Sequence, residues 1–207
     1  MSAQRFRLVA VSDNRGDAAR IERVAMEAAE GGLAAICLRE PDMPARRLGQ
    51  LIQRLADQLR PMGVSVLVSD RIDVAIASGA DGAQLGFRAV PLEEARRMAP
   101  RPFLIGISAH EGDDLAELAR LGADYAFLGP LFDTPSKRGW RNAMGIEKVE
   151  AAAASGVLPV LAIGGIELGT ARGLARGRLA GMAVVRAIFE SENPRRAAQA
   201  LLAEAAS

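Results

Sequence analysis

The chain has 207 residues, of which 50% are apolar and 25% charged, and its 26 Lys and Arg residues almost balance its 25 Asp and Glu residues. The formal net charge of +1 gives no sign of the basic surface that binds nucleic acid. No apolar stretch approaches the roughly 20 residues of a membrane span, and the first residues do not have the pattern of a signal peptide. A single cysteine, Cys37, excludes an internal disulfide framework. We therefore expect a cytoplasmic globular protein without a membrane or nucleic-acid partner.

Short runs rich in Val, Ile and Leu alternate along the chain with Ala-, Arg-, Glu- and Leu-rich stretches that have helical spacing. Continuous apolar runs are typical of strands buried on both faces of a parallel sheet. The predicted strands are residues 6–11, 34–38, 64–68, 82–85, 103–107, 125–128, 159–163 and 181–185. The predicted helices are residues 17–30, 44–60, 71–78, 91–99, 113–121, 145–155, 168–176 and 194–205.

A weak internal repeat supports this alternation. The stretch Gly79-Ala80-Asp81-Gly82 resembles Gly122-Ala123-Asp124-Tyr125, and each is predicted to end a helix on a left-handed glycine immediately before a strand. Eight evenly spaced βα units predict an α/β fold, a single compact (β/α)8 TIM barrel domain spanning residues 1–207, in preference to a doubly wound sheet. Because aromatic residues make up only 4% of the chain, we expect Val, Ile, Leu and Ala to fill the barrel.

The barrel fold predicts where the chemistry lies, because catalytic groups of such folds follow the carboxyl ends of the strands. Gly164 and Gly165 follow the seventh predicted strand, and Arg186 follows the eighth. Glycines allow backbone N–H groups to approach a ligand, and the loops after strands seven and eight are the usual phosphate site of a barrel. We interpret this segment as a phosphate site, although a glycine pair can also be no more than a tight turn.

Two further features point to an anionic ligand at the same end. His110, the only histidine, follows the fifth predicted strand beside Ser108, and it is the side chain best suited to move protons at neutral pH. The long segment 129–142 carries Ser136, Lys137 and Arg138, which would suit a loop closing over an anionic substrate. The alternatives are a histidine buried in the core and an ordinary solvated loop.

Several segments together resemble the thiamine phosphate synthase/TenI family, also called the thiamine-phosphate pyrophosphorylase superfamily. The resemblance covers nearly the whole chain in the right order. Its segments are Leu38-Arg39-Glu40, the run from Val68 to Ala75, Gly79 to Gly86, Gly106 to His110, Gly122 to Tyr125, Gly129 to Lys137, and Ala162 to Ile166.

The synthases of this family join a pyrimidine pyrophosphate to a thiazole phosphate and release pyrophosphate. The resemblance implies that Arg39 and Lys137 face the pyrophosphate and that Asp70 is a Mg²⁺ ligand. It also implies that the loop after the sixth strand contacts the substrate and that residues after the seventh and eighth strands bind the thiazole phosphate. The substrate-binding residues expected in addition are Gln84, Ser108, Thr134 and Ser136, and the phosphate-binding residues are Gly164, Gly165, Val185 and Arg186.

The sequence departs from the synthase pattern at four places. Pro41 stands where synthases have Lys, Ser69 where they have Asn, Ala89 where they have a second acidic Mg²⁺ ligand, and Arg186 where they usually have Ser. The first and third departures remove charge that a pyrophosphate–Mg²⁺ complex needs.

The TenI-type thiazole tautomerases of the same family have His at the position of His110 and Gln at the position of Gln84. Proton transfer on a thiazole needs an acid/base and a phosphate anchor but no metal. The sequence interpretation therefore favours a tautomerase with His110 as the catalytic residue, acting on a small phosphorylated thiazole without a cofactor. A Mg²⁺-dependent synthase with Asp70 as a metal ligand and a non-catalytic phosphate-ligand binder are the alternatives. A homo-oligomer is compatible with the sequence, which leaves oligomeric state open.

Overall fold

Eight parallel strands form a closed barrel in the computed structural model, which describes residues 6–133 and 142–207. Each strand pairs with the next one along the chain, and β8 closes the ring by pairing with β1. This is the predicted (β/α)8 TIM barrel, and every strand begins and ends within two residues of its predicted bounds. The strands are β1 (Leu8–Val11), β2 (Ala35–Leu38), β3 (Ser65–Ser69), β4 (Gly82–Leu85), β5 (Leu104–Ala109), β6 (Tyr125–Leu128), β7 (Val160–Ile163) and β8 (Gly181–Val184).

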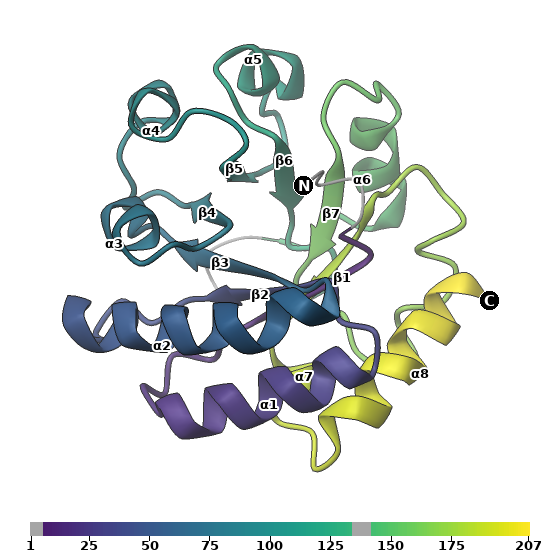
Figure 1. The fold of residues 1–207 in the computed structure, drawn as a ribbon. Helices are drawn as coiled ribbons and strands as arrows, with labels where there is room; N and C mark the ends of the chain where they lie inside the picture. The colour runs from purple at the N-terminus through teal and green to yellow at the C-terminus, as the bar shows by residue number, and fades with distance from the viewer. Residues whose placement is uncertain (1–5, 134–141) are drawn as a thin grey trace.

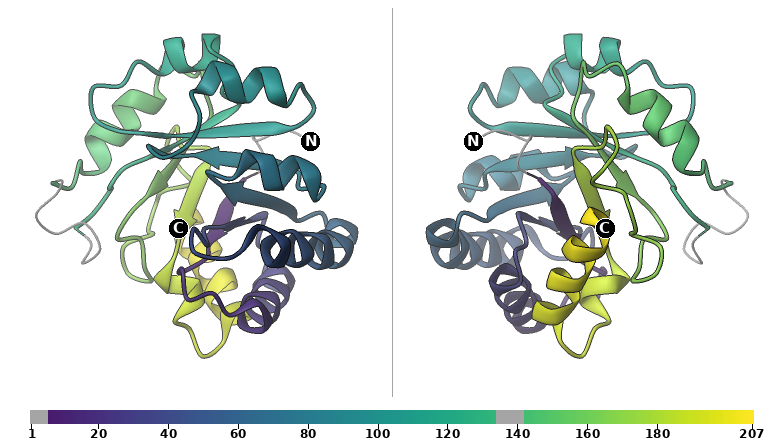
Figure 2. Two further views of the ribbon diagram at one scale, coloured as in Figure 1. Left: turned by 90° about the vertical axis from the view of Figure 1, so that its left-hand side faces the viewer. Right: turned by 90° about the vertical axis from the view of Figure 1, so that its right-hand side faces the viewer.

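The helices surround the strands (Figure 1), and seven of the eight predicted helices are present. Figure 2 shows the same layers from two sides, with helices on the outside of the barrel. A short 3-10 turn, η2, and a four-residue helix, α7, were not predicted. The elements are α1 (Ala18–Glu30), α2 (Ala45–Leu59), η2 (Arg60–Met62), α3 (Ile72–Ala77), α4 (Leu92–Met98), α5 (Leu115–Arg120), α6 (Ile146–Ala153), α7 (Arg186–Phe189) and α8 (Pro194–Ala206).

The helix predicted over residues 168–176 is absent, so that prediction is wrong. The chain between β7 and β8 forms a series of turns, with N–H groups of Thr170, Leu174 and Arg176 each donating to the carbonyl three residues earlier. Gly169 and Gly173 have φ values of 93° and 75° within this segment. Two left-handed residues four positions apart interrupt any α-helix, although the Ala- and Leu-rich composition has helical spacing.

Alternate residues of each strand face two different cores. In β1, Leu8 and Ala10 point outward to the helices, whereas Val9 and Val11 point into the barrel. The outer core is the larger one and is built from aliphatic side chains on both the strands and the helices. Because side chains alternate with a period of two along a strand, the same parity divides all eight strands.

The barrel interior contains aromatic rings, contrary to the expectation of aliphatic and Ala layers. Phe6, Tyr125 and Phe127 lie in it, with the Phe6 and Tyr125 rings 5.5 Å apart in a T-shaped arrangement. The space for these rings comes from small inward residues on other strands, of which Gly106 is the clearest case. A Cβ on Gly106 would lie 2.2 Å from Tyr125 Cζ. The few aromatic residues of the chain are therefore concentrated where volume is needed.

The aspartates of the repeated Gly-Ala-Asp stretch connect neighbouring strands, a role that the sequence analysis did not predict. Asp81, just before β4, accepts a hydrogen bond from Val66 N in β3, and Asp124, just before β6, accepts one from Ile105 N in β5. Asp81 also forms an ion pair with Arg60 of η2, and Asp124 forms one with Arg96 of α4. The repeat therefore joins neighbouring βα units at the amino ends of the strands, and Gly79 and Gly122 adopt the left-handed φ that was predicted.

The first and last helices pack side by side and connect the two ends of the chain (Figure 1). The approach is close at Gly31, where a Cβ would lie 2.3 Å from the carbonyl oxygen of Arg195. Leu201 of α8 is completely buried in the outer core.

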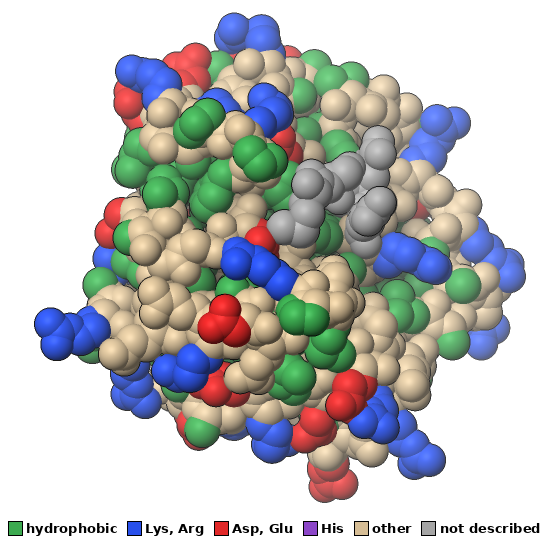
Figure 3. Space-filling model, in the orientation of Figure 1, with side chains coloured by type: hydrophobic (Ala, Val, Ile, Leu, Met, Phe, Trp, Pro, Cys, Tyr) green, Lys and Arg blue, Asp and Glu red, His purple; other side chains and the backbone are tan. Residues whose placement is uncertain are grey.

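None of the helices in the described ranges combines the length and hydropathy needed to cross a bilayer. On the described part of the face in Figure 3, basic and acidic side chains are interspersed, without a large region of one sign.

Candidate active site

A cavity of about 420 Å³ opens at the carboxyl ends of the strands. It is larger than two other cavities of the described residues, which have volumes of about 20 and 270 Å³, and it lies where a barrel carries its catalytic groups. Most of the residues that the sequence analysis singled out line it together. They are Arg39, Gln84, Ser108, His110, Gly164, Gly165, Val185 and Arg186.

Strand parity explains why these residues meet. Arg39 shares the inward face of β2 with Cys37, two residues earlier, and Val185 shares the inward face of β8 with Ala183. The last inward positions of each strand therefore form the wall of the cavity, whichever residues precede them in the sequence.

Three predicted substrate-binding residues, Thr134, Ser136 and Lys137, lie outside the described residues. Asp70 is described but does not line the cavity. Its φ is 60°, and its Oδ1 accepts a 2.6 Å hydrogen bond from Gly86 N, which ties the turn after β3 to the turn after β4. Within the described ranges, no three acidic, histidine or cysteine side chains form a group that could hold a metal ion. Ala89 adds no carboxylate, so these residues do not form a magnesium site of their own.

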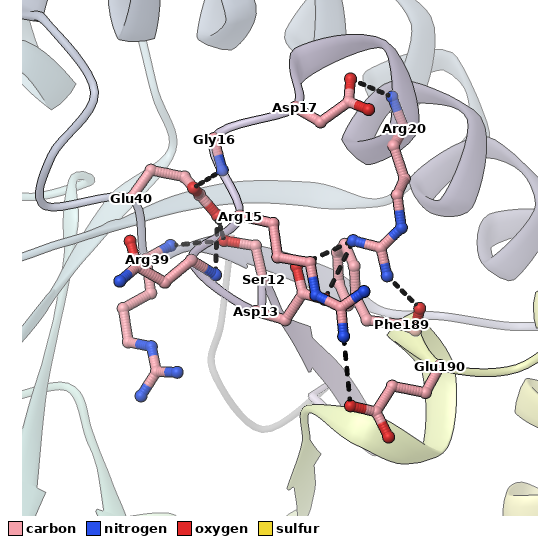
Figure 4. Close-up of polar contacts among 11 residues, drawn as sticks. Ser12, Asp13, Arg15, Gly16, Asp17, Arg20, Arg39, Glu40, Phe189 and Glu190 are labelled. Atoms are coloured by element: carbon pink, nitrogen blue, oxygen red, sulfur yellow. Dashed lines mark hydrogen bonds and ion pairs between the residues drawn. The ribbon is translucent and has the colours of Figure 1, made fainter.

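Arg39 is positioned by a buried network behind the cavity wall (Figure 4). Arg39 N donates to Ser12 Oγ at 2.8 Å, and Ser12 Oγ donates to Glu40 Oε1 at 2.6 Å. The buried Glu40 carboxylate also accepts hydrogen bonds from Asn14 N and Gly16 N. The Arg39 guanidinium extends away from this network and has no ion-pair partner among the described residues. It is therefore free to meet an anionic ligand.

The glycine pair after β7 requires glycine at both positions. Gly164 and Gly165 have φ values of 103° and 69°. A Cβ on Gly164 would lie 2.8 Å from Pro130 Cβ, and one on Gly165 would lie 2.7 Å from Phe132 Cβ. Both the backbone conformation and the contact with the loop after β6 therefore exclude side chains here. The result is a stretch of accessible backbone that suits the approach of a phosphate.

Charges of both signs border the cavity. Arg186 Nη2 lies 2.6 Å from Glu167 Oε1, which belongs to the loop after β7. After the neighbouring strand β1, Arg15 Nε lies 3.1 Å from Asp13 Oδ2, and Arg15 Nη2 lies 3.5 Å from Glu190 Oε1 (Figure 4). Two of the three cavity arginines are thus paired with carboxylates of the same cavity, and Arg39 is not.

His110 is held by the loop after β6. Its Nδ1 lies 3.2 Å from the carbonyl oxygen of Gly129, and its backbone N–H donates to Asp113 Oδ2 at 2.7 Å. Since a carbonyl oxygen only accepts, this contact places the proton of the neutral ring on Nδ1. Nε2 then keeps its lone pair and can accept a proton, which is the property the sequence analysis attributed to His110.

The floor of the cavity is polar within an otherwise apolar barrel. Gln84 Nε2 donates to Ser108 Oγ at 3.2 Å, and burial raises the pKa of the Cys37 thiol to about 12, so the thiol stays protonated at neutral pH. Gln84 Oε1 and the Tyr125 hydroxyl are buried and have no hydrogen-bond partner among the described residues. Burial also raises the pKa of Tyr125 well above its ordinary value.

Sequence reasoning missed several residues of the cavity. Some lie inside strands, where it did not search, and others follow strands but belong to no motif that marks them as ligand contacts. Cys37 and Phe127 lie inside strands, and their inward parity was the available signal. Glu190, more than 170 residues from Arg15, had no sequence signal at all. The lining residues with charged, polar or aromatic side chains that were not assigned to the site are Asp13, Arg15, Cys37, Ser69, Phe127, Glu167 and Glu190.

The model of the thiamine monophosphate synthase family matches residues 8–188, which is most of the chain. The chain belongs to this family.

Its relatives include the thiamine-phosphate synthase of Vibrio parahaemolyticus, 35% identical over 197 residues that cover 95% of this chain and 97% of that protein. The thiamine-phosphate synthase of Leptospira biflexa is 36% identical over 186 residues, covering 88% of this chain and 89% of the relative. A solved thiamine phosphate pyrophosphorylase from Pyrococcus furiosus superposes with a TM-score of 0.87 at 31% identity, over 99% of both chains. A 3-hexulose-6-phosphate synthase, with a TM-score of 0.70 and 20% identity, shares the fold alone.

These relatives bear on the choice left open by the sequence. The named relatives are synthases, which are transferases, and the family model carries the same description. The comparisons therefore favour the synthase alternative over the tautomerase interpretation of His110.

Proposed function

We propose that the protein is a transferase of the thiamine-phosphate synthase type, joining a pyrimidine pyrophosphate to a thiazole phosphate with release of pyrophosphate. The observation that carries this proposal is that one cavity brings two separate anion-binding regions together. Arg39 follows β2, and the glycine pair with Arg186 follows β7 and β8, on the other side of β1. Two anionic substrates that must react with each other need such an arrangement. The similarity to synthases over nearly the whole chain supports the same reaction.

The two regions divide the work. The unpaired Arg39 guanidinium binds the pyrophosphate and stabilises the negative charge that grows on it as its bond to the pyrimidine-bearing carbon breaks. Gly164, Gly165 and Arg186 bind the phosphate of the thiazole and orient its ring toward that carbon. The described residues form no metal site of their own, and the assay tests whether turnover requires Mg²⁺.

The test is turnover of pyrimidine pyrophosphate and thiazole phosphate by the purified protein, with and without Mg²⁺. We expect formation of thiamine phosphate, and we expect Arg39→Gln to lower kcat/KM by about 100-fold, since it removes a charge-stabilising group. Arg88→Gln is the matched control, because Arg88 lies at the same end of the barrel but does not line the cavity. A wild-type protein that forms no thiamine phosphate under either condition would contradict the proposal.

One observation keeps an isomerase as the second candidate: the Gly129 carbonyl leaves Nε2 of His110 free to accept a proton in the cavity. Under this alternative, His110→Ala abolishes proton exchange on a phosphorylated thiazole, measured by loss of ring deuterium. Under the synthase proposal, the same variant retains condensation within about tenfold, because no proton transfer by His110 is required. A protein that catalyses neither reaction, yet melts at a higher temperature with thiazole phosphate, is a phosphate-ligand binder.

A further inference from the structure

Arg186, in the region proposed to bind phosphate, is already paired with the carboxylate of Glu167. Arg186 Nη2 and Glu167 Oε1 lie 2.6 Å apart, and both residues line the cavity. Their side chains are 39% and 49% exposed, so solvent and a ligand can reach the pair. The carboxylate comes from the loop after β7, next to the glycine pair, and therefore occupies the region where the proposed function requires a phosphate.

The position of Glu167 is set by its own loop. Glu167 N lies 2.9 Å from Thr170 Oγ1, and Thr170 Oγ1 donates to the carbonyl oxygen of Glu167 at 3.0 Å. The glycine pair precedes it with positive φ values that residues with a side chain rarely adopt. The backbone of Glu167 is thus fixed beside the phosphate region, and only its side chain can turn away from Arg186.

We propose that Glu167 acts as the internal counter-ion of Arg186 and limits the affinity of this region for anions. A ligand that binds Arg186 must displace the Glu167 carboxylate and tolerate its negative charge nearby. The cost of displacement is the same for every anion, but the remaining repulsion grows with the charge of the ligand. Glu167 therefore lowers the affinity for all anions, and it lowers that for dianionic phosphate monoesters most. This inference depends on the proposed function only for the location of the phosphate.

The experiment is isothermal titration with methyl phosphate, a dianion, and dimethyl phosphate, a monoanion, as probes. In Glu167→Gln we expect methyl phosphate to bind about three- to tenfold more tightly, because a partly exposed like charge is removed. We expect dimethyl phosphate to gain less, because it carries only one negative charge, so the preference for the dianion over the monoanion should become larger. In Arg186→Gln we expect methyl phosphate to bind more weakly, and in the double variant the gain from Glu167→Gln should largely disappear, since there is no arginine left to release.

Glu190→Gln is the matched control. Glu190 lines the same cavity and pairs with an arginine, but that arginine is Arg15 after β1 and not Arg186. We expect it to change the affinity for methyl phosphate by less than twofold. Melting curves of the ligand-free variants verify that all of them are folded.

Unchanged or weaker phosphate binding in Glu167→Gln would overturn the inference, and so would an equal gain in Glu190→Gln, which would indicate a general charge effect. The outcome is independent of turnover. If the protein makes no thiamine phosphate but Glu167→Gln binds methyl phosphate more tightly, the proposed function fails and the role of Glu167 stands.

Discussion

At the scale of single residues, Tyr125 combines a favourable and an unfavourable contribution to stability inside the barrel. Tyr125 fills the interior beside Phe6, yet its hydroxyl is buried without a partner among the described residues. A buried hydroxyl that makes no hydrogen bond costs free energy of folding, because it has lost its contacts with water. The Tyr125 ring therefore stabilises the folded barrel through packing, whereas its buried hydroxyl lowers the stability.

Tyr125→Phe is therefore expected to leave the free energy of unfolding unchanged or to raise it by up to about 1 kcal/mol, measured by urea unfolding. Tyr125→Leu is the comparison that removes the ring as well, and it should cost about 2–4 kcal/mol through lost packing. A clear loss of stability in Tyr125→Phe would mean that a buried water molecule bonds to the hydroxyl.

At the scale of secondary-structure elements, the two ends of the strands have different tasks. The carboxyl ends carry the cavity, and the amino ends carry the repeated aspartates that join one βα unit to the next. Asp124 is partly buried, with 11% of its side chain exposed, and its carboxylate accepts a hydrogen bond from Ile105 N and pairs with Arg96 and Arg101. Loss of one partner from such a group leaves the others desolvated and unpaired.

Asp124→Asn is expected to lower the free energy of unfolding by about 2–4 kcal/mol while kcat/KM of the folded enzyme stays unchanged, because the residue lies at the end of the barrel opposite the cavity. The control is Glu117→Gln, which breaks an exposed pair with Arg120 and should cause no measurable change. A fall in kcat/KM without a fall in stability would contradict this assignment.

At the scale of the whole molecule, the first and last segments of the chain meet in both layers of the barrel. β8 pairs with β1, and outside them α8 packs against α1. Because every strand has a neighbour on both sides, loss of this seam removes support from the entire ring rather than from one edge. Stability of the described barrel should therefore be shared by all of its strands.

Leu201→Ala, at a completely buried position of α8, is expected to cost about 2–5 kcal/mol. Leu202→Ala, at the neighbouring half-buried position, should cost clearly less. Hydrogen exchange provides the measurement: the protection of amides in β4 should fall as much as that in β1, since both exchange by global unfolding. An effect limited to α1 and α8 would show that the seam opens separately.

Much of the candidate site could be predicted because strand ends are visible in the sequence. Gly164, Arg186 and His110 each follow an apolar run, and the barrel rule then places them around one cavity. Asp70 shows the limit of this reasoning: its sequence position matches a metal ligand, but its carboxylate bonds to Gly86 N and lies outside the cavity lining. A sequence position gives the strand end, and the local backbone decides where the carboxylate points.

The eight-strand alternation and the left-handed glycines before β4 and β6 were predictable from local patterns, because buried strands, helix ends and left-handed turns each have a local chemical signature. Three features became known from the folded chain: residues 168–176 form turns, aromatic rings fill part of the barrel, and Glu167 lies against Arg186. These outcomes depend on space and charge shared between segments distant in the chain, and no local pattern records which partners will meet.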